Sequence, residues 1–149
     1  MRSLIYFMLA GLLPSIEPRY AVPLCIASGE PPAACIAVGI ADVAILALLL
    51  PGLMRILDKL LPSTRLGRLY MRYRARVERI AEKHQGLTML GLVGFIAVPL
   101  PGTGVWTGAL LAYLIGFEGR AATLALLAGG LAGLAVTAAP TLLIGGVVS

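Results

Sequence analysis

The chain has 149 residues, of which 59% are hydrophobic and 13% are charged. A soluble domain carries about 25% charged residues, so this composition excludes an ordinary soluble protein and indicates a surface that contacts lipid. The length is that of a single domain. Nine of the twelve Lys and Arg residues fall within residues 53–86. Attraction to anionic lipid head groups explains this basic segment better than nucleic-acid binding does.

The first hydrophobic block runs from Leu4 to about Gly29, is interrupted at residues 14–19 and is marked again at Pro23. Residues 4–13 are too few to span a membrane, which takes about 20 apolar residues, and no small-residue cleavage site follows them, so we expect no cleavable signal peptide. Glu17 and Arg19 lie inside this block, where a charge is costly and a functional role is the default hypothesis. Arg19 suits a phosphate or carboxylate, and Glu17 could carry a proton. The alternative is an exposed interfacial loop at residues 14–20.

The second block, residues 33–50, is continuous apart from Asp42 and ends at Pro51. It is long enough to cross a membrane as one helix. Asp42 is expected to face the interior of the helix bundle, where it could pair with Arg19 or line a path. Cys25 and Cys35 show no metal-binding or redox spacing, so they are predicted to be two small buried hydrophobic residues.

The basic segment has helical periodicity over residues 65–83. Basic residues recur every three or four positions, and apolar residues follow the same rhythm on another face. This pattern predicts an amphipathic helix on the membrane surface, and the positive-inside rule places it in the cytoplasm. We expect anionic lipids to bind its basic face, which consists of Arg65, Arg68, Arg72, Arg76, Arg79 and Lys83.

The third block, residues 87–117, is uncharged but interrupted by Pro99-Leu100-Pro101-Gly102-Thr103-Gly104. Two prolines around one residue should stop a helix. Thr103 is expected to cap the helix that follows, whose free amide groups would favour a negative group at membrane depth. The alternative is a structural break that lets helices pack. The fourth block, residues 121–148, has a small residue at every fourth position from Ala121 to Gly133, which permits close packing within or between subunits.

The order of these blocks predicts an all-α, multi-pass protein of the cell membrane. Repeat one covers residues 1–52, the amphipathic linker 53–86 and repeat two 87–149. We favour re-entrant hairpins for the two broken blocks, which would then enter from opposite faces and make the halves inverted repeats, each a hairpin plus one transmembrane helix. In the alternative, the broken blocks cross the bilayer and the halves are parallel.

With these residues in view, the chain resembles the small multi-drug export protein family. The family's Glu-x-Arg-x-Ala-Ile/Val-Pro start is matched at residues 17–23, where Tyr20 replaces a usual glycine, and its Pro-Leu-Pro-Gly-Thr-Gly-x-Trp-Thr-Gly-Ala stretch is matched at residues 99–109. The family's name implies transport. The family is also similar to the DedA superfamily, whose paired re-entrant hairpins are linked to movement of phospholipids or polyisoprenyl phosphates. That resemblance implies a phosphate head group as the ligand.

The first functional hypothesis is therefore a proton-coupled transporter, exporter or lipid flippase for a small amphiphile or phosphate-bearing lipid, with Glu17 as the proton carrier. The alternative is a non-transporting lipid-binding or membrane-assembly protein. We expect a homodimer, and we expect no enzyme activity, cofactor, metal or nucleic-acid partner. The predicted substrate- or ion-binding residues are Glu17, Arg19, Pro23, Asp42, Pro99, Pro101, Gly102, Thr103, Gly104, Trp106, Thr107 and Gly108.

Overall fold

The computed structural model describes residues 2–64, 67–83 and 88–148, and within these stretches the chain is helical with no strand. Its elements are α1 (Arg2–Gly11), α2 (Glu17–Ala27), α3 (Pro32–Leu60), the 3-10 turn η1 (Leu61–Ser63), α4 (Gly67–Lys83), α5 (Met89–Ala97), α6 (Val105–Ile115) and α7 (Gly119–Val148).

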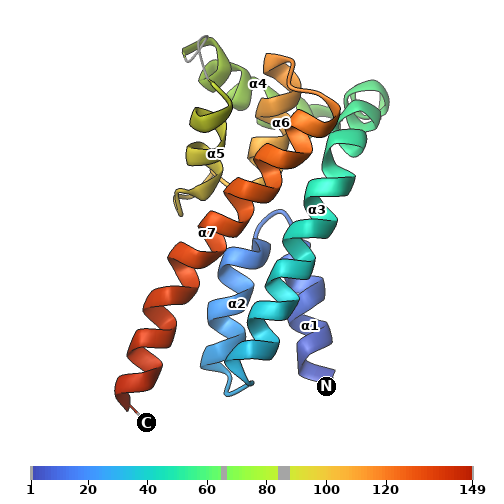
Figure 1. Ribbon diagram of the computed structural model, residues 1–149. Coiled ribbons are helices and arrows are strands. Elements are labelled where there is room, and N and C mark those ends of the chain that lie inside the picture. Colours follow the sequence, from blue (N-terminus) through green and yellow to red (C-terminus); the bar gives the residue numbers. More distant parts are fainter. Residues whose placement is uncertain (1, 65–66, 84–87, 149) are drawn as a thin grey trace.

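Two long helices run the full length of the molecule. Helices α3 and α7 run along the molecule in opposite directions (Figure 1). The segments Pro32–Ser63 and Gly119–Ile144 are long and apolar enough to span a membrane. We call the end that carries α4 the basic end. The opposite end, where α1 begins, α7 finishes and α2 turns into α3, is the terminal end.

The four remaining apolar helices form two short hairpins beside these long helices. Helices α1 and α2 extend from the terminal end to the middle of the molecule and back, and α5 and α6 do the same from the basic end (Figure 1). Their 9–11 residues give each helix a length of about 14–16 Å, roughly half of a hydrocarbon core of about 30 Å. The two hairpin tips therefore meet near mid-height.

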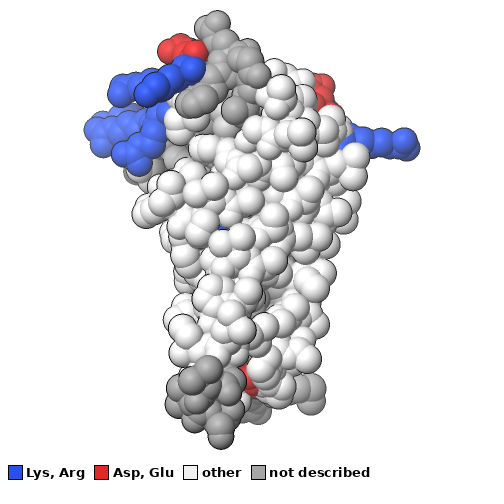
Figure 2. Space-filling view, turned by 60° about the vertical axis from the view of Figure 1, so that its left-hand side comes forward, with Lys and Arg blue, Asp and Glu red and all other residues white. Residues whose placement is uncertain are grey.

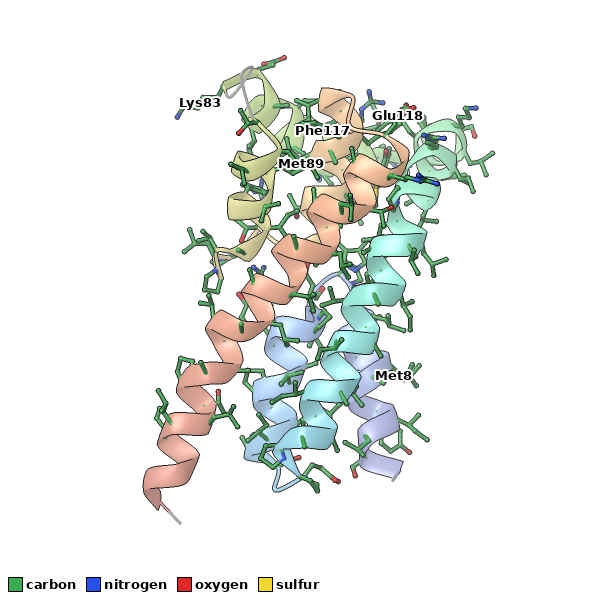
Figure 3. The ribbon with its side chains drawn as sticks, viewed as in Figure 1. Met8, Lys83, Met89, Phe117 and Glu118 are labelled. Carbon is green, nitrogen blue, oxygen red and sulfur yellow. A yellow bond between two sulfur atoms is a disulfide. The ribbon has the colours of Figure 1, made fainter. Side chains whose placement is uncertain are left out.

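The surface between the two ends is apolar. Figure 2 shows Lys and Arg gathered at the basic end and a wide band almost without charge below them. Within this band Leu48 of α3 and Leu143 of α7 are 70% and 72% exposed, and Met8 projects from α1 away from the bundle (Figure 3). Large exposed apolar side chains on several helices, among them α1, α3 and α7, fit contact with lipid rather than with water.

Small residues let α7 pack closely on α5, as the sequence pattern predicted. An added Cβ on Gly129 would lie 2.6 Å from the side chain of Ile96, and one on Gly133 would lie 3.3 Å from the carbonyl of Ala97. The main hydrophobic cluster fills the basic half, where Met89 and Phe117 pack against it. Both residues lie at that end, as does Glu118 in the turn before α7 (Figure 3).

Helix α4 confirms the predicted amphipathic helix over the residues described, but it packs on the bundle. Gly67, Tyr70 and Val77 are buried, and the Tyr70 hydroxyl donates to Asp58 Oδ1 at 3.2 Å. The exposed face carries Arg68, Arg72, Arg76, Arg79 and Lys83, whereas Arg65 lies outside the described residues.

Two local predictions were wrong. Helix α3 continues through Pro51 to Leu60, because a proline late in a long packed helix can be tolerated when neighbouring groups satisfy the backbone. The residue that caps α6 is Gly104 rather than Thr103.

The two cysteines are joined rather than free. Cys25 near the end of α2 and Cys35 in the first turns of α3 form a disulfide, with their Cα atoms 5.8 Å apart. Their spacing of ten residues brackets the tight α2–α3 turn, which brings the two helix ends together. The prediction of two small buried hydrophobic residues was therefore correct about burial and wrong about chemistry.

Candidate functional site

The tip of the α5–α6 hairpin, residues 98–104, leaves backbone carbonyl groups without helical partners. Arg19 from the other hairpin donates to them. Its Nη1 donates to the carbonyl of Val98 at 2.9 Å and to the hydroxyl of Thr103 at 3.2 Å, and its Nη2 donates to the carbonyl of Leu100 at 3.3 Å and to that of Thr103. One guanidinium thus supplies the donors that the end of the first half-helix needs.

Glu17 serves the other side of the same break. The N–H of Val105, the first residue of α6, donates to Glu17 Oε2 at 3.2 Å, where the positive end of the helix dipole favours a negative charge. Gly104 makes this approach possible. Its φ is 123°, and an added Cβ would overlap the Glu17 carboxylate and lie 2.8 Å from Arg19 Nη2.

The two charged side chains also form an ion pair. Arg19 Nε lies 3.4 Å from Glu17 Oε2, and the residues are only 6% and 3% exposed, which rules out the alternative of an exposed loop for both. Glu17 adopts φ 55°, a left-handed conformation that is uncommon outside glycine. Such strain persists where surrounding contacts fix the residue, and it concentrates at functional sites.

A cavity of about 340 Å³ lies beside this pair. Both hairpin tips line it, and Tyr73 of α4 reaches it as well. The hydroxyl of Tyr73 lies 2.8 Å from that of Thr107 on α6. Desolvation raises the pKa of the Tyr73 phenol, more than its hydrogen bond with Thr107 lowers it, so the phenol stays neutral at physiological pH. The lining residues are Pro14, Ser15, Glu17, Arg19, Tyr20, Tyr73, Pro101, Gly102, Thr103 and Thr107.

A groove of about 610 Å³ adjoins the cavity. It runs between α4 and α5, carries Arg79 and Lys83, and is otherwise mostly apolar, with Phe95 and Leu111 among its lining residues. Thr103 lines both the groove and the cavity. The combination suits an elongated amphiphile, with an apolar tail against α5 and a negative group beside the basic side chains.

Comparison with known proteins identifies the family. A family model described as "Putative small multi-drug export protein" matches residues 17–136. The chain belongs to this family. The match begins at Glu17 and takes in Arg19, α3, and the whole α5–α6 hairpin. No curated protein and no solved structure matches the chain.

For this member of the small multi-drug export family, the family match and the structure both indicate a membrane protein. The two long apolar helices and the family match make it a membrane protein with transmembrane helices. The family's name describes an exporter, which is a transport protein.

Asp42 is a predicted site residue that lies away from the cavity. It is buried, as expected, but neither of its carboxylate oxygens has a hydrogen-bond partner among the described residues. The predicted pairing with Arg19 is wrong, because Arg19 pairs with Glu17. Asp42 is also absent from the lining of the cavity.

Some of the other predicted residues lie in the α5–α6 tip, and the rest lie in the helices packed beside it. Pro101, Gly102 and Thr103 line the cavity; Pro99 lies in the same tip. Gly108 lets α6 approach α5, since an added Cβ would overlap Ile96. Pro23 lies inside α2, two turns from the tip. Trp106 follows Val105 on α6, and its buried indole N–H has no hydrogen-bond partner in the described part of the chain.

Four residues that line the cavity were absent from the predicted set, namely Pro14, Ser15, Tyr20 and Tyr73. Of these, Tyr73 comes from the element farthest from the two tips in sequence, the helix α4. Its position in the helical pattern assigned it to the apolar face of the amphipathic helix. The signal that could have identified it is its hydroxyl, which an apolar face packed only against lipid has no means to satisfy.

Proposed function

We propose that this protein is a small transporter that moves an amphiphile with an anionic head group, such as a phosphate-bearing lipid, across the cytoplasmic membrane. The observation that carries the proposal is the buried Glu17–Arg19 pair, which lines a cavity at mid-height of the apolar band. Charges at that depth mark substrate or ion pathways by default. The adjoining groove, with Arg79 and Lys83, offers a place for the amphiphile to enter.

The two short hairpins fit a re-entrant arrangement. Each returns to the end from which it starts (Figure 1), and helices of 9–11 residues are too short to span the bilayer alone. On this proposal α1–α3 and α5–α7 are inverted repeats, and the substrate site lies where the repeats meet, as in many transporters. The likeness to the DedA superfamily remains a prediction from the sequence.

Two features support a cytoplasmic basic end. The exposed Arg and Lys residues of α4 lie there, and positive charge favours the cytoplasmic side. The Cys25–Cys35 disulfide lies at the terminal end, and disulfides persist in oxidising compartments outside the cytoplasm.

In the proposed cycle the substrate head group competes with Glu17. The carboxylate occupies the positive end of α6 beside Arg19, which is the position that suits a phosphate or carboxylate of the substrate. Protonation of an acidic group in the membrane region would couple this exchange to a proton gradient, and Glu17 is the carrier predicted from the sequence.

A homodimer would complete the site. Pro14, Ser15, Pro101 and Gly102 line the mouth of the cavity and are exposed, although irregular backbone at membrane depth requires cover by protein or a water-filled path. A second copy placed over the two tips supplies that cover.

Reconstitution tests the transport proposal. Liposomes containing the protein are loaded with labelled phospholipids, polyisoprenyl phosphates or cationic dyes, and movement is followed with and without a pH gradient. We expect an anionic amphiphile to move and Arg19→Lys to slow it at least tenfold, because a Lys ammonium cannot reproduce the forked contacts of the guanidinium. Arg55→Lys, at an exposed ion pair, is the matched control. Equal rates for Arg19→Lys and wild type would refute the site.

One observation favours the alternative, a non-transporting lipid-binding or membrane-assembly protein. The Nη donors of Arg19 are all directed at groups of the hairpin tip, as in a purely structural clamp. Single cysteines at positions 15 and 107, which line the cavity, in a background with Cys25 and Cys35 replaced by Ser, separate the two functions. Labelling of either position from both sides of the membrane supports transport, whereas protection from both sides supports the alternative.

A further inference from the structure

Asp42 is the one buried charged residue described for which the proposed substrate site has no use. It lies in the first half of α3 and is 0% exposed, and neither of its oxygens has a hydrogen-bond partner among the residues that the structure describes. Its carboxylate lies against Gly11, the last residue of α1, so closely that an added Cβ on Gly11 would overlap Asp42 Oδ2. An ionised carboxylate in such a place needs a compensating positive charge.

No cationic side chain faces this carboxylate from the described elements packed around it. The charged residues of α2 are Glu17 and Arg19, and both are directed at the α5–α6 tip. The described side chains of α1 include one titratable group, the exposed phenol of Tyr6. On α3 the next charged residue is Arg55, thirteen residues or about 20 Å further along the helix. On α7 the charged residue is Arg120, which is exposed at the basic end.

The nearest backbone element adds to the negative potential instead of relieving it. Helix α1 ends at Gly11, so the negative end of its dipole lies beside Asp42, while the carbonyls of Met8 and Ala10 in its last turn accept from the N–H groups of Leu12 and Leu13. A carboxylate beside a helix C-terminus repels a second anion and attracts a cation. In transporters built from broken helices, half-helix C-terminal ends and free carbonyls hold sodium ions or protons, whereas half-helix N-terminal ends hold anionic substrate groups.

We propose that Asp42 and the C-terminal end of α1 form a binding site for a monovalent cation, either a proton or a sodium ion, which is the coupling ion of the transport proposed above. The inference rests on that proposed function, and it assigns ion binding to Asp42 rather than to Glu17. The assignment leaves Glu17 and Arg19 to the head group. Because α1 belongs to one hairpin and α3 is a long spanning helix, occupation of the site would determine how firmly the hairpin seats against α3.

The test uses the full chain in phosphatidylcholine nanodiscs, without a transported substrate. The Tm of wild type and of Asp42→Asn is measured in sodium chloride and in choline chloride at equal ionic strength, and from about pH 6 to about pH 9. A sodium site raises the Tm of the wild type in sodium by about 3–5 °C at tenfold excess over Kd and leaves Asp42→Asn unchanged. A proton site gives a wild-type Tm that falls as the pH rises and a flat profile for Asp42→Asn. Glu118→Gln, which removes an exposed carboxylate, keeps the wild-type response.

A second measurement on the wild type covers the case in which Asp42→Asn does not fold. A hydrophobic carbodiimide reacts with protonated carboxyl groups within membranes, and mass spectrometry locates the adduct. Modification of Asp42 that decreases at high pH, or that sodium protects against, supports the site. A wild-type Tm that responds to neither cation, together with no adduct at Asp42, overturns it. Neither measurement involves transport. A negative result in both would overturn the cation site and leave the transport proposal intact, and absence of transport in liposomes would still allow the cation site to be tested.

Discussion

Replacing Arg19 by Ala tests whether the hairpin tips are held together by the buried charge pair. The guanidinium makes four hydrogen bonds to the tip and pairs with Glu17. The hydroxyl of Thr103 lies 2.5 and 2.8 Å from the carbonyls of Val98 and Leu100. Its single hydrogen can donate to one of them at a time, so one of the two carbonyls keeps a partner in the variant. The main loss is then the carboxylate left buried without its cation, which costs about 3–5 kcal/mol.

The double variant Glu17→Gln/Arg19→Ala isolates that charge. It leaves no unpaired ion, so we expect it to be more stable than Arg19→Ala by about 2 kcal/mol, within the range of couplings measured between contacting residues. Glu17→Gln alone should lose only about 1–2 kcal/mol, because the carbonyls still stabilise the guanidinium. Removing the cation is therefore expected to be worse than removing the anion.

Unfolding in mixed detergent micelles provides the assay. Trp106 is the only tryptophan of the chain and follows the residue that binds Glu17, so its fluorescence reports on the tip while circular dichroism reports on the whole bundle. Arg55→Ala is the control, since its ion pair is 48% and 62% exposed and should be worth at most about 1 kcal/mol. The reasoning is refuted if Arg19→Ala is no less stable than Glu17→Gln, or if the double variant is less stable than Arg19→Ala.

Three further outcomes follow from the structure. Gly104→Ala should lower the free energy of unfolding in detergent by about 1–3 kcal/mol, because φ 123° is strained for any residue with a Cβ. The control Gly94→Ala adds a methyl group in open space on a helix and should be neutral or slightly stabilising, so equal losses for the two variants would contradict the prediction. Burial and a nearby carboxylate raise the pKa of Tyr70 from 10.0 to about 12, so the neutral phenol stabilises the fold below about pH 10. Up to about 2.7 kcal/mol of the free energy of unfolding is lost as the pH rises to about 12, and unfolding measured against alkaline pH should show this loss for wild type and not for Tyr70→Phe. Replacing Cys25 and Cys35 by Ser should cost at most about 3 kcal/mol for so short a loop, and reduction of the wild type should give the same midpoint; free thiols in the unreduced protein, detected by alkylation and mass spectrometry, would disprove the bond.

Composition and proline spacing were enough to predict most of the architecture. The break at residues 98–104 was expected because two prolines flank Leu100, and the structure ends α5 at Ala97 and begins α6 at Val105. The same rule failed at Pro51, which is followed by Gly52 but lacks the second proline that stops the helix at the tip. The periodicity of the sequence predicted the position of α4 but not the face that it buries. That face is set by tertiary contact with α6, which the spacing of residues within α4 does not determine.

The site was predictable as a set of residues and not as a set of partners. Glu17 and Arg19 were selected because charges are rare inside hydrophobic blocks, and Thr103 because it lies in the break. Two residues apart on a regular helix, Glu17 and Arg19 would point to different faces. The left-handed conformation of Glu17 turns both towards the tip, and no rule of spacing predicts such a conformation for a glutamate.

The broken helices explain why these charges lie where they do. A hairpin that turns at mid-depth exposes the C-terminal end of one half-helix and the N-terminal end of the next, and both need polar partners where lipid offers none. For α5 and α6 those partners are Arg19 and Glu17. For the first hairpin, α2 begins at Glu17, whose N–H donates to the carbonyl of Leu13 at 3.0 Å, and Pro18 in the same turn has no N–H to satisfy. The end of α1 faces Asp42, a group of the same sign. Of the four half-helix ends, this is the one whose described surroundings call for a positive charge that no side chain supplies, so a mobile cation is the partner that would complete the pattern.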